Sequence, residues 1–89
     1  MKLEKKIKIK NDLGLHIRPA ATIVKLLQEY KSSVYFTYNG MTINARSIMS
    51  ILTLVAKKNA MIKIAIYGSD AKKVLNRLDE LFKKGFGEK

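Results

Sequence analysis

The sequence predicts an α+β fold, an open-faced sandwich in which a four-stranded antiparallel sheet has three helices packed on one face. Three observations lead to this prediction. Residues 2–9 alternate apolar and polar side chains, as a strand with one buried face does, whereas residues 17–30 and 71–82 have helical spacing. Asn39-Gly40, between two further strand-like segments, is a strong hairpin signal. The resulting order is βαββαβα, which favours an antiparallel sheet with its helices on one side.

The first half of the chain is expected to form a strand, a loop and a helix. The strand covers residues 2–9, and the loop that follows contains Asn-Asp and Gly14, which favour turns. In residues 17–30, Pro19 suits the first helical turn because the N–H that it lacks has no partner there. One buried stripe is expected at the spacing i, i+3, i+4 and i+7, formed by Ala20, Ile23, Val24 and Leu27.

The middle of the chain is expected to form a hairpin and a short helix. Residues 33–38 are β-branched and aromatic, and residues 41–45 form the return strand. The periodicity of residues 47–55 is ambiguous, but Ser47 is a good N-cap and favours a helix. The turn that follows contains Asn59, a residue type that tolerates a left-handed backbone.

The last third of the chain is expected to add a strand and a helix. Residues 60–67 form the strand, and Gly68 and Ser69-Asp70 open the helix. Its apolar residues keep one helical register: Ala71, Val74, Leu75, Leu78, Leu81 and Phe82.

The length and composition of the chain exclude several classes of function. A chain of 89 residues suits a single domain over residues 1–89, without room for a large buried active site. The absence of cysteine excludes disulfides, thiolate metal sites and cysteine nucleophiles, and neither a metal-ligand cluster nor a cofactor site is expected. No stretch is apolar enough for a signal peptide or a membrane span, so a cytoplasmic protein is expected.

The chain is strongly basic, with 18 Lys and Arg against 7 Asp and Glu and a formal net charge of +11. Such a charge suggests that nucleic acid could be a partner, because basic surfaces displace counterions from phosphate backbones. The excess is spread along the sequence, with only a mild concentration in residues 1–10. It is equally consistent with solubility or with docking on acidic proteins.

His16, the only histidine, is the main candidate for chemistry. It directly precedes the predicted helix, whose N-terminal N–H groups and partial positive charge favour anions. Arg18 adds a permanent cation whose planar fork suits phosphate. Both positive groups disfavour the imidazolium, so we expect a neutral, nucleophilic ring that accepts a phosphoryl group. The alternative is a surface histidine that has only a structural role.

Two motifs carry a resemblance to a known family. The segment Gly14-Leu15-His16-Ile17-Arg18-Pro19-Ala20 resembles the active-centre motif of HPr, the histidine-containing phosphocarrier of the sugar phosphotransferase system (PTS). The segment Asn44-Ala45-Arg46-Ser47-Ile48-Met49-Ser50 resembles the regulatory-serine segment of that family, and the ending Gly85-Phe86-Gly87-Glu88 is similar as well.

This resemblance implies a carrier rather than an enzyme. It would accept a phosphoryl group from enzyme I on Nδ1 of His16, with Arg18 assisting, and pass it to enzyme IIA domains. It implies no nucleic-acid partner and no membrane insertion, and a monomer is expected. Ser47, a helix N-cap in any case, would be the target of an HPr kinase/phosphorylase.

A docking surface is expected around His16. The segment 48–55 is apolar on nearly every side, and a short helix on a sheet buries only one face. We therefore expect Ile51 and either Leu54 or Val55 to be buried, and Ile48, Met49 and Leu52 to lie at the surface. By resemblance, the partner-binding residues would be Ala21, Lys25, Ile48, Met49 and Leu52.

Two alternatives remain open. One is a regulatory relative of the carrier that uses the same His16 chemistry outside sugar uptake. The other is an RNA-binding sheet, suggested by the βαββαβ order of elements, the aromatic segment 35–38 and the basic surface. Against RNA binding, that strand lacks the glycine-aromatic pattern of such sheets, and Phe36 would face the core together with Val34 and Tyr38.

Overall fold

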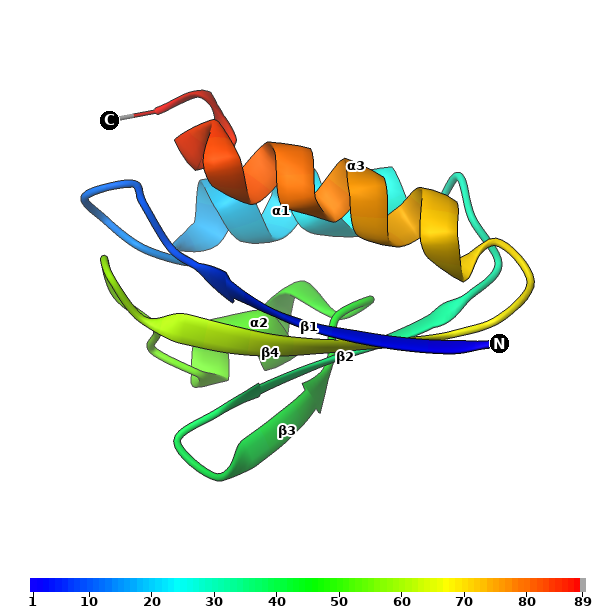
Figure 1. The fold of residues 1–89 in the computed structure, drawn as a ribbon. Helices are drawn as coiled ribbons and strands as arrows, with labels where there is room; N and C mark the ends of the chain where they lie inside the picture. Colours follow the sequence, from blue (N-terminus) through cyan, green and yellow to red (C-terminus); the bar gives the residue numbers. More distant parts are fainter. Residues whose placement is uncertain (89) are drawn as a thin grey trace.

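The structure, a computed structural model, describes residues 1–88 and has the predicted order of elements (Figure 1). Its strands and helices are β1 (Lys2–Lys8), α1 (Ile17–Leu27), β2 (Ser33–Tyr38), β3 (Met41–Asn44), α2 (Ile48–Thr53), β4 (Met61–Tyr67) and α3 (Ala71–Lys83). A 3-10 turn, η1 (Gly85–Gly87), follows α3 and was not among the predicted elements.

The four strands form one antiparallel sheet in the order β1-β4-β2-β3. β4, the last strand in sequence, lies between β1 and β2, so the first and last strands of the chain pair with each other. Its register brings Ile62 opposite Ile7 of β1 and Ile64 opposite Phe36 of β2. Because side chains alternate across a strand, this register gathers the apolar side chains on one face of the sheet.

Helices α1 and α3 lie over that apolar face (Figure 1), and the shorter α2 packs against α1 and β3. In α1, Ala20, Ile23 and Leu27 are buried as predicted, whereas Val24 is half-buried. The buried members of the stripe on α3 are Ala71, Val74, Leu78 and Phe82. Phe82 meets Phe36 edge to face, with ring centroids 6.0 Å apart, and so joins α3 to the centre of the sheet.

The predicted turns are confirmed by their backbone angles. Asn39 and Gly40 have φ values of 51° and 76°, the left-handed pair that a two-residue hairpin with this twist requires. Asn59 also has a positive φ, of 74°. A further left-handed residue, Val55 (φ 49°), follows α2, where helices commonly end on glycine.

One element boundary differs by several residues from the sequence-based expectation. The first helix ends at Leu27 rather than at residue 30, and Arg46 donates hydrogen bonds to carbonyl groups at and after that end. Asp70 precedes α3 as expected, but its carboxylate does not cap that helix. No helix within residues 1–88 is long and apolar enough to cross a membrane.

Candidate functional site

His16 lies at the N-cap position of α1, at the end of a loop that is fixed on both sides. The backbone N–H of Leu15 donates to the carbonyl of Ala56 (2.9 Å), and the N–H of Ala20 donates to the carbonyl of His16 (3.1 Å). Gly14 makes the approach to Ala56 possible, because a Cβ at that position would lie 2.3 Å from the Ala56 oxygen. The loop therefore sets the position of the imidazole before the helix begins.

The N-terminus of α1 has no side-chain cap. The His16 side chain makes no hydrogen bond to the helix backbone, and the first N–H groups of a helix have no intrahelical carbonyl to bind. Pro19 is buried in the first turn and contributes no N–H. Arg18, one residue before it, is exposed. The start of α1 thus presents backbone donors and a guanidinium beside a histidine, an arrangement suited to an anion.

A carboxylate contacts the His16 ring, and the sequence did not reveal it. Oε1 of Glu88 lies 2.6 Å from Nε2 of His16 and also accepts a hydrogen bond from Nδ2 of Asn11 (2.9 Å). The hydrogen bond from His16 is the main cause that lowers the pKa of Glu88, and those from Asn11 and the nearby charge of Arg18 act in the same direction. The expectation for His16 considered two positive groups, the helix terminus and Arg18, and the structure adds a carboxylate in contact with the ring.

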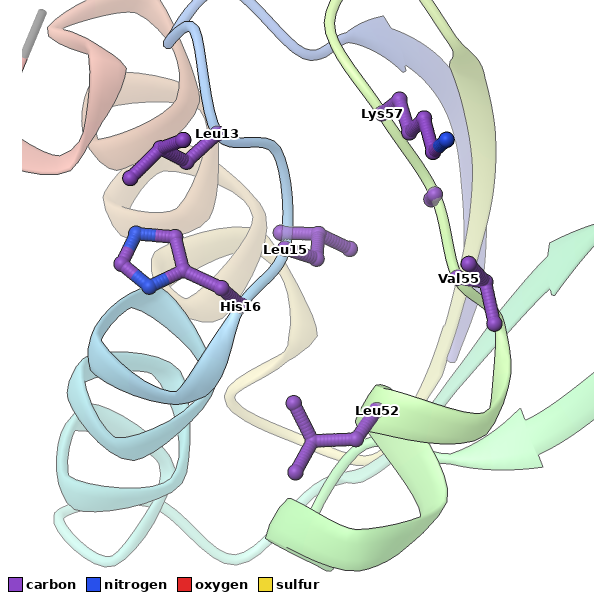
Figure 2. A pocket seen from close by; sticks show the side chains of 7 residues that line it. Leu13, Leu15, His16, Leu52, Val55 and Lys57 are labelled. Atoms are coloured by element: carbon purple, nitrogen blue, oxygen red, sulfur yellow. The ribbon is translucent and has the colours of Figure 1, made fainter.

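An apolar hollow adjoins the histidine. Figure 2 shows the His16 ring beside Leu13 on the α1 side, while Leu52, Val55 and Lys57 come from the opposite side of the hollow. Its other lining residues are Leu15 and Ala56. Thus Leu52, one of the residues predicted around His16, does share a surface with it.

The predicted docking residues have mixed exposure. Met49 is 73% exposed, and Ala21 and Lys25 are exposed on α1. The prediction of surface positions for Ile48 and Leu52 is wrong in part, because both are half-buried and pack against the core.

The reason is the position of α2 between α1 and β3, which covers more than one face of so short a helix. Ile51 and Leu54 are buried as expected, and Val55 is the exposed member of its pair, at 68%.

Ser47 is the N-cap of α2, as predicted. Its Oγ accepts a hydrogen bond from the N–H of Ser50 (3.2 Å). The preceding residue, Arg46, donates to the carbonyls of Leu27 (2.9 Å) and Tyr30 (2.7 Å). It also donates to the carbonyl of Ser32, at 2.7 Å. Arg46 therefore ties the Ser47 segment to the C-terminal end of α1, a role that no local sequence signal indicates.

The fold and the site define a class of small α+β proteins with one half-buried histidine at the start of a helix. Within residues 1–88, no three His, Cys, Asp or Glu side chains gather as a metal site would need. Residues 3–84 match the family described as "PTS HPr component phosphorylation site".

Curated relatives and a solved structure agree with that match. The phosphocarrier protein HPr of Chlamydia muridarum is 50% identical over 80 residues, 90% of this chain and 77% of the relative. HPr of Xylella fastidiosa (strain Temecula1) is 34% identical over 86 residues, 97% of each chain. A crystal structure of HPr from Thermoanaerobacter tengcongensis superimposes with a TM-score of 0.92 at 33% identity, covering 98% of each chain. The chain belongs to the HPr family of the phosphotransferase system.

Proposed function

We propose that this chain is a cytoplasmic phosphocarrier that accepts a phosphoryl group from enzyme I on Nδ1 of His16 and passes it to enzyme IIA domains. The observation that carries the proposal is the position of His16 at the uncapped N-terminus of α1. Nε2 is occupied by Glu88, which leaves Nδ1 as the ring nitrogen for the phosphoryl group. Membership of the HPr family supports the same chemistry.

Charge neutralisation is the main task at such a site. Phosphoryl transfer needs in-line positioning and stabilisation of the charge on the equatorial oxygens more than bond-making chemistry by side chains. The backbone donors at the start of α1 and the exposed guanidinium of Arg18 are suited to that task. No cofactor is required, and the donor and acceptor proteins supply the remaining groups.

The partner surface would surround His16. Exposed Met49 on α2 and exposed Ala21 and Lys25 on α1 supply apolar and basic contacts, and half-buried Ile48 and Leu52 extend the apolar part. A basic carrier of net charge +11 would be steered electrostatically to acidic patches on its partners.

Ser47 would be a regulatory phosphorylation site for an HPr kinase/phosphorylase. Its Oγ already accepts from Ser50 N–H at the start of α2. A phosphate there would keep an acceptor at the helix terminus and would add negative charge next to Ile48 and Met49. Regulation would therefore act through the partner surface rather than through the fold.

The test is phosphorylation by enzyme I with radiolabelled phosphoenolpyruvate. The wild type and Ser47→Ala should take up the label, and His16→Ala should take up none while keeping its circular dichroism spectrum. The bond should be labile in acid and stable in base, as a phosphoramidate is. Label retained by the His16→Ala variant, or a base-labile bond, would contradict the assignment.

The choice of acceptor protein distinguishes a carrier for sugar uptake from a regulatory carrier outside sugar uptake. Sugar-permease IIA domains should take the phosphoryl group from the labelled chain. Transfer only to a regulatory protein would favour the role outside sugar uptake.

A further inference from the structure

The segment after α3 carries Glu88 back to the start of α1. Gly85, Phe86 and Gly87 have φ values of 59°, 57° and 78°, a run of left-handed backbone that reverses the chain. The N–H of Glu88 closes the turn on the carbonyl of Gly85 (3.0 Å). The strain at the non-glycine Phe86 is offset by its ring, which packs on Phe82 with centroids 4.9 Å apart.

Asn11 fixes the Glu88 carboxylate from the other side. Asn11 is 1% exposed, and its Nδ2 donates to the carbonyl of Gly14 (2.8 Å) and to Oε1 of Glu88 (2.9 Å). Within residues 1–88 its Oδ1 has no hydrogen-bond partner. The two acceptors therefore set the orientation of the amide, although a buried acceptor stays unpaired. The same side chain thus holds both the loop before His16 and the carboxylate against it.

This carboxylate determines which nitrogen of His16 carries a proton. Its pKa is lowered, chiefly by the hydrogen bond from His16, so at neutral pH it is ionised and only accepts hydrogen bonds. Nε2, 2.6 Å from Oε1, must then be the donor. In a neutral imidazole with a proton on Nε2, the lone pair lies on Nδ1.

We propose that Glu88, held by Asn11, is a positioning residue for phosphoryl transfer at His16. It keeps the ring in the Nε2–H form and stabilises the positive charge that the ring acquires when Nδ1 takes the phosphoryl group. This inference rests on the proposed function. The logic is that of a carboxylate behind a catalytic histidine, which orients the ring and stabilises its charged form without itself taking the proton.

The step balances without any proton leaving the site. The Nδ1 lone pair forms the new P–N bond as the bond between phosphorus and the donor nitrogen of enzyme I breaks, and that electron pair returns to the donor. The ring of His16 becomes cationic and keeps its Nε2 proton, hydrogen-bonded to Glu88. When the phosphoryl group moves on, the pair of the P–N bond returns to Nδ1 and the ring is neutral again. Glu88 thus keeps the phosphorylated ring in its protonated form, from which the imidazole leaves as a neutral group.

The experiment compares Glu88→Ala and Glu88→Gln with the wild type. Glu29→Gln, an exposed carboxylate beyond the far end of α1, is the charge-matched control. The first readout is the tautomer of His16 in the unphosphorylated protein, from its ring 15N shifts at about pH 9, above the range in which imidazole titrates. The second is phosphorylation by enzyme I, with kcat and KM measured separately.

The wild type and Glu29→Gln should show the Nε2–H tautomer only, and Glu88→Ala should gain a clear Nδ1–H population. Its kcat should fall about tenfold with KM unchanged, the size expected for losing one charge-assisted hydrogen bond. Glu88→Gln, which keeps a neutral acceptor, should hold the tautomer and lose part of the rate. Melting curves identify any variant whose fold is damaged.

An unchanged tautomer in Glu88→Ala, or an unchanged kcat, overturns this inference. A fall in kcat that Glu29→Gln shares also overturns it, because net charge would then explain the effect. A wild type that takes no phosphoryl group refutes the proposed function instead, and the tautomer of the same samples still shows whether Glu88 orients the ring.

Discussion

The N-termini of α1 and α2 differ in how their backbone donors are satisfied. At α2, the hydroxyl of Ser47 accepts from the N–H of Ser50, and the terminus is closed by its own cap. At α1, the residue in the same position is His16, whose side chain turns away from the helix to Glu88. A capped terminus stabilises its helix, whereas an uncapped one keeps its donors available for an anion. The difference explains why the two helix starts suit different tasks.

The start of α3 is a third case. Asp70 occupies the N-cap position, but its carboxylate accepts from the backbone N–H groups of Lys31 (2.8 Å) and Ser32 (3.1 Å), and from the Ser32 hydroxyl. The residue type suggests a cap, and the side chain instead joins α3 to the loop before β2. The start of α3 therefore connects two distant segments of the chain, whereas the cap at the start of α2 stabilises only its own helix.

The largest expected effect on stability comes from Gly14→Ala, which would disturb the loop that positions the start of α1. The new Cβ would lie 2.3 Å from the Ala56 oxygen on a backbone with φ of +67°. Steric overlap and left-handed strain together should cost about 3 kcal/mol of unfolding free energy. Gly40→Ala is the control, since its φ is +76° and no atom lies within 4 Å of the new Cβ. If both variants lost the same unfolding free energy in urea denaturation, left-handed strain alone would account for the effect and the contact with Ala56 would not.

Arg18→Ala tests whether the open terminus acts on the moving phosphoryl group. The exposed guanidinium would neutralise charge that develops during transfer, so kcat with enzyme I should fall about 100-fold. The unfolding free energy should stay within about 0.5 kcal/mol of the wild type. Lys25→Ala, an exposed cation in the last turn of the same helix, should change KM and its salt dependence instead. An equal loss of binding and rate in Arg18→Ala would make Arg18 an ordinary docking contact.

Ser47 variants test the capped terminus. Ser47→Ala removes the acceptor for Ser50 N–H and should cost about 1 kcal/mol without slowing transfer. Ser47→Asp keeps a capping acceptor and suits the helix dipole, so its stability should equal or exceed that of the wild type by up to ~1 kcal/mol. Its charge beside Ile48 and Met49 should nevertheless slow phosphorylation by enzyme I. Unchanged transfer in Ser47→Asp would remove Ser47 from the partner surface.

The smallest expected effect concerns the α3 terminus and appears only in acid. Hydrogen bonds from the Ser32 hydroxyl and from the backbone of Lys31 and Ser32 lower the pKa of Asp70 below its ordinary value of 3.8. A depressed pKa adds stability above pH 3.8, and that stability is lost as the pH falls through the lower value in the folded state. Asp70→Asn should therefore be less stable near neutral pH and show a flatter pH dependence below about 4.

The matched control for this prediction is Asp12→Asn. Asp12 forms an exposed ion pair with Lys58, at 2.8 Å with the Asp12 side chain 64% exposed, and such pairs contribute little. Urea midpoints measured from pH 7 down to about 3 would compare the two variants. Identical pH profiles for both would contradict the special role of Asp70.

Local chemistry in the sequence was sufficient to predict the elements and to single out His16 as the candidate for chemistry. Alternation and helical spacing identify the strands and helices to within a few residues, because each pattern reflects which face of an element is buried. Asn39-Gly40 and Asn59 mark their turns, since few residue types accept a left-handed backbone. His16 stands out because it directly precedes a helix whose first turn contains proline. Ser47 is recognisable as a cap for the same local reason.

Tertiary structure decided what depends on residues that are distant in the sequence. The order β1-β4-β2-β3 results from the insertion of β4 between β1 and β2, which no local pattern encodes. The half-buried state of Ile48 and Leu52 results from α1 and β3 packing around α2. Glu88 reaches His16 across 72 positions of sequence, and Asn11 reaches Glu88 across 77. A carboxylate or an amide has no periodicity that reveals its partner, so only the folded chain could show that these three side chains meet.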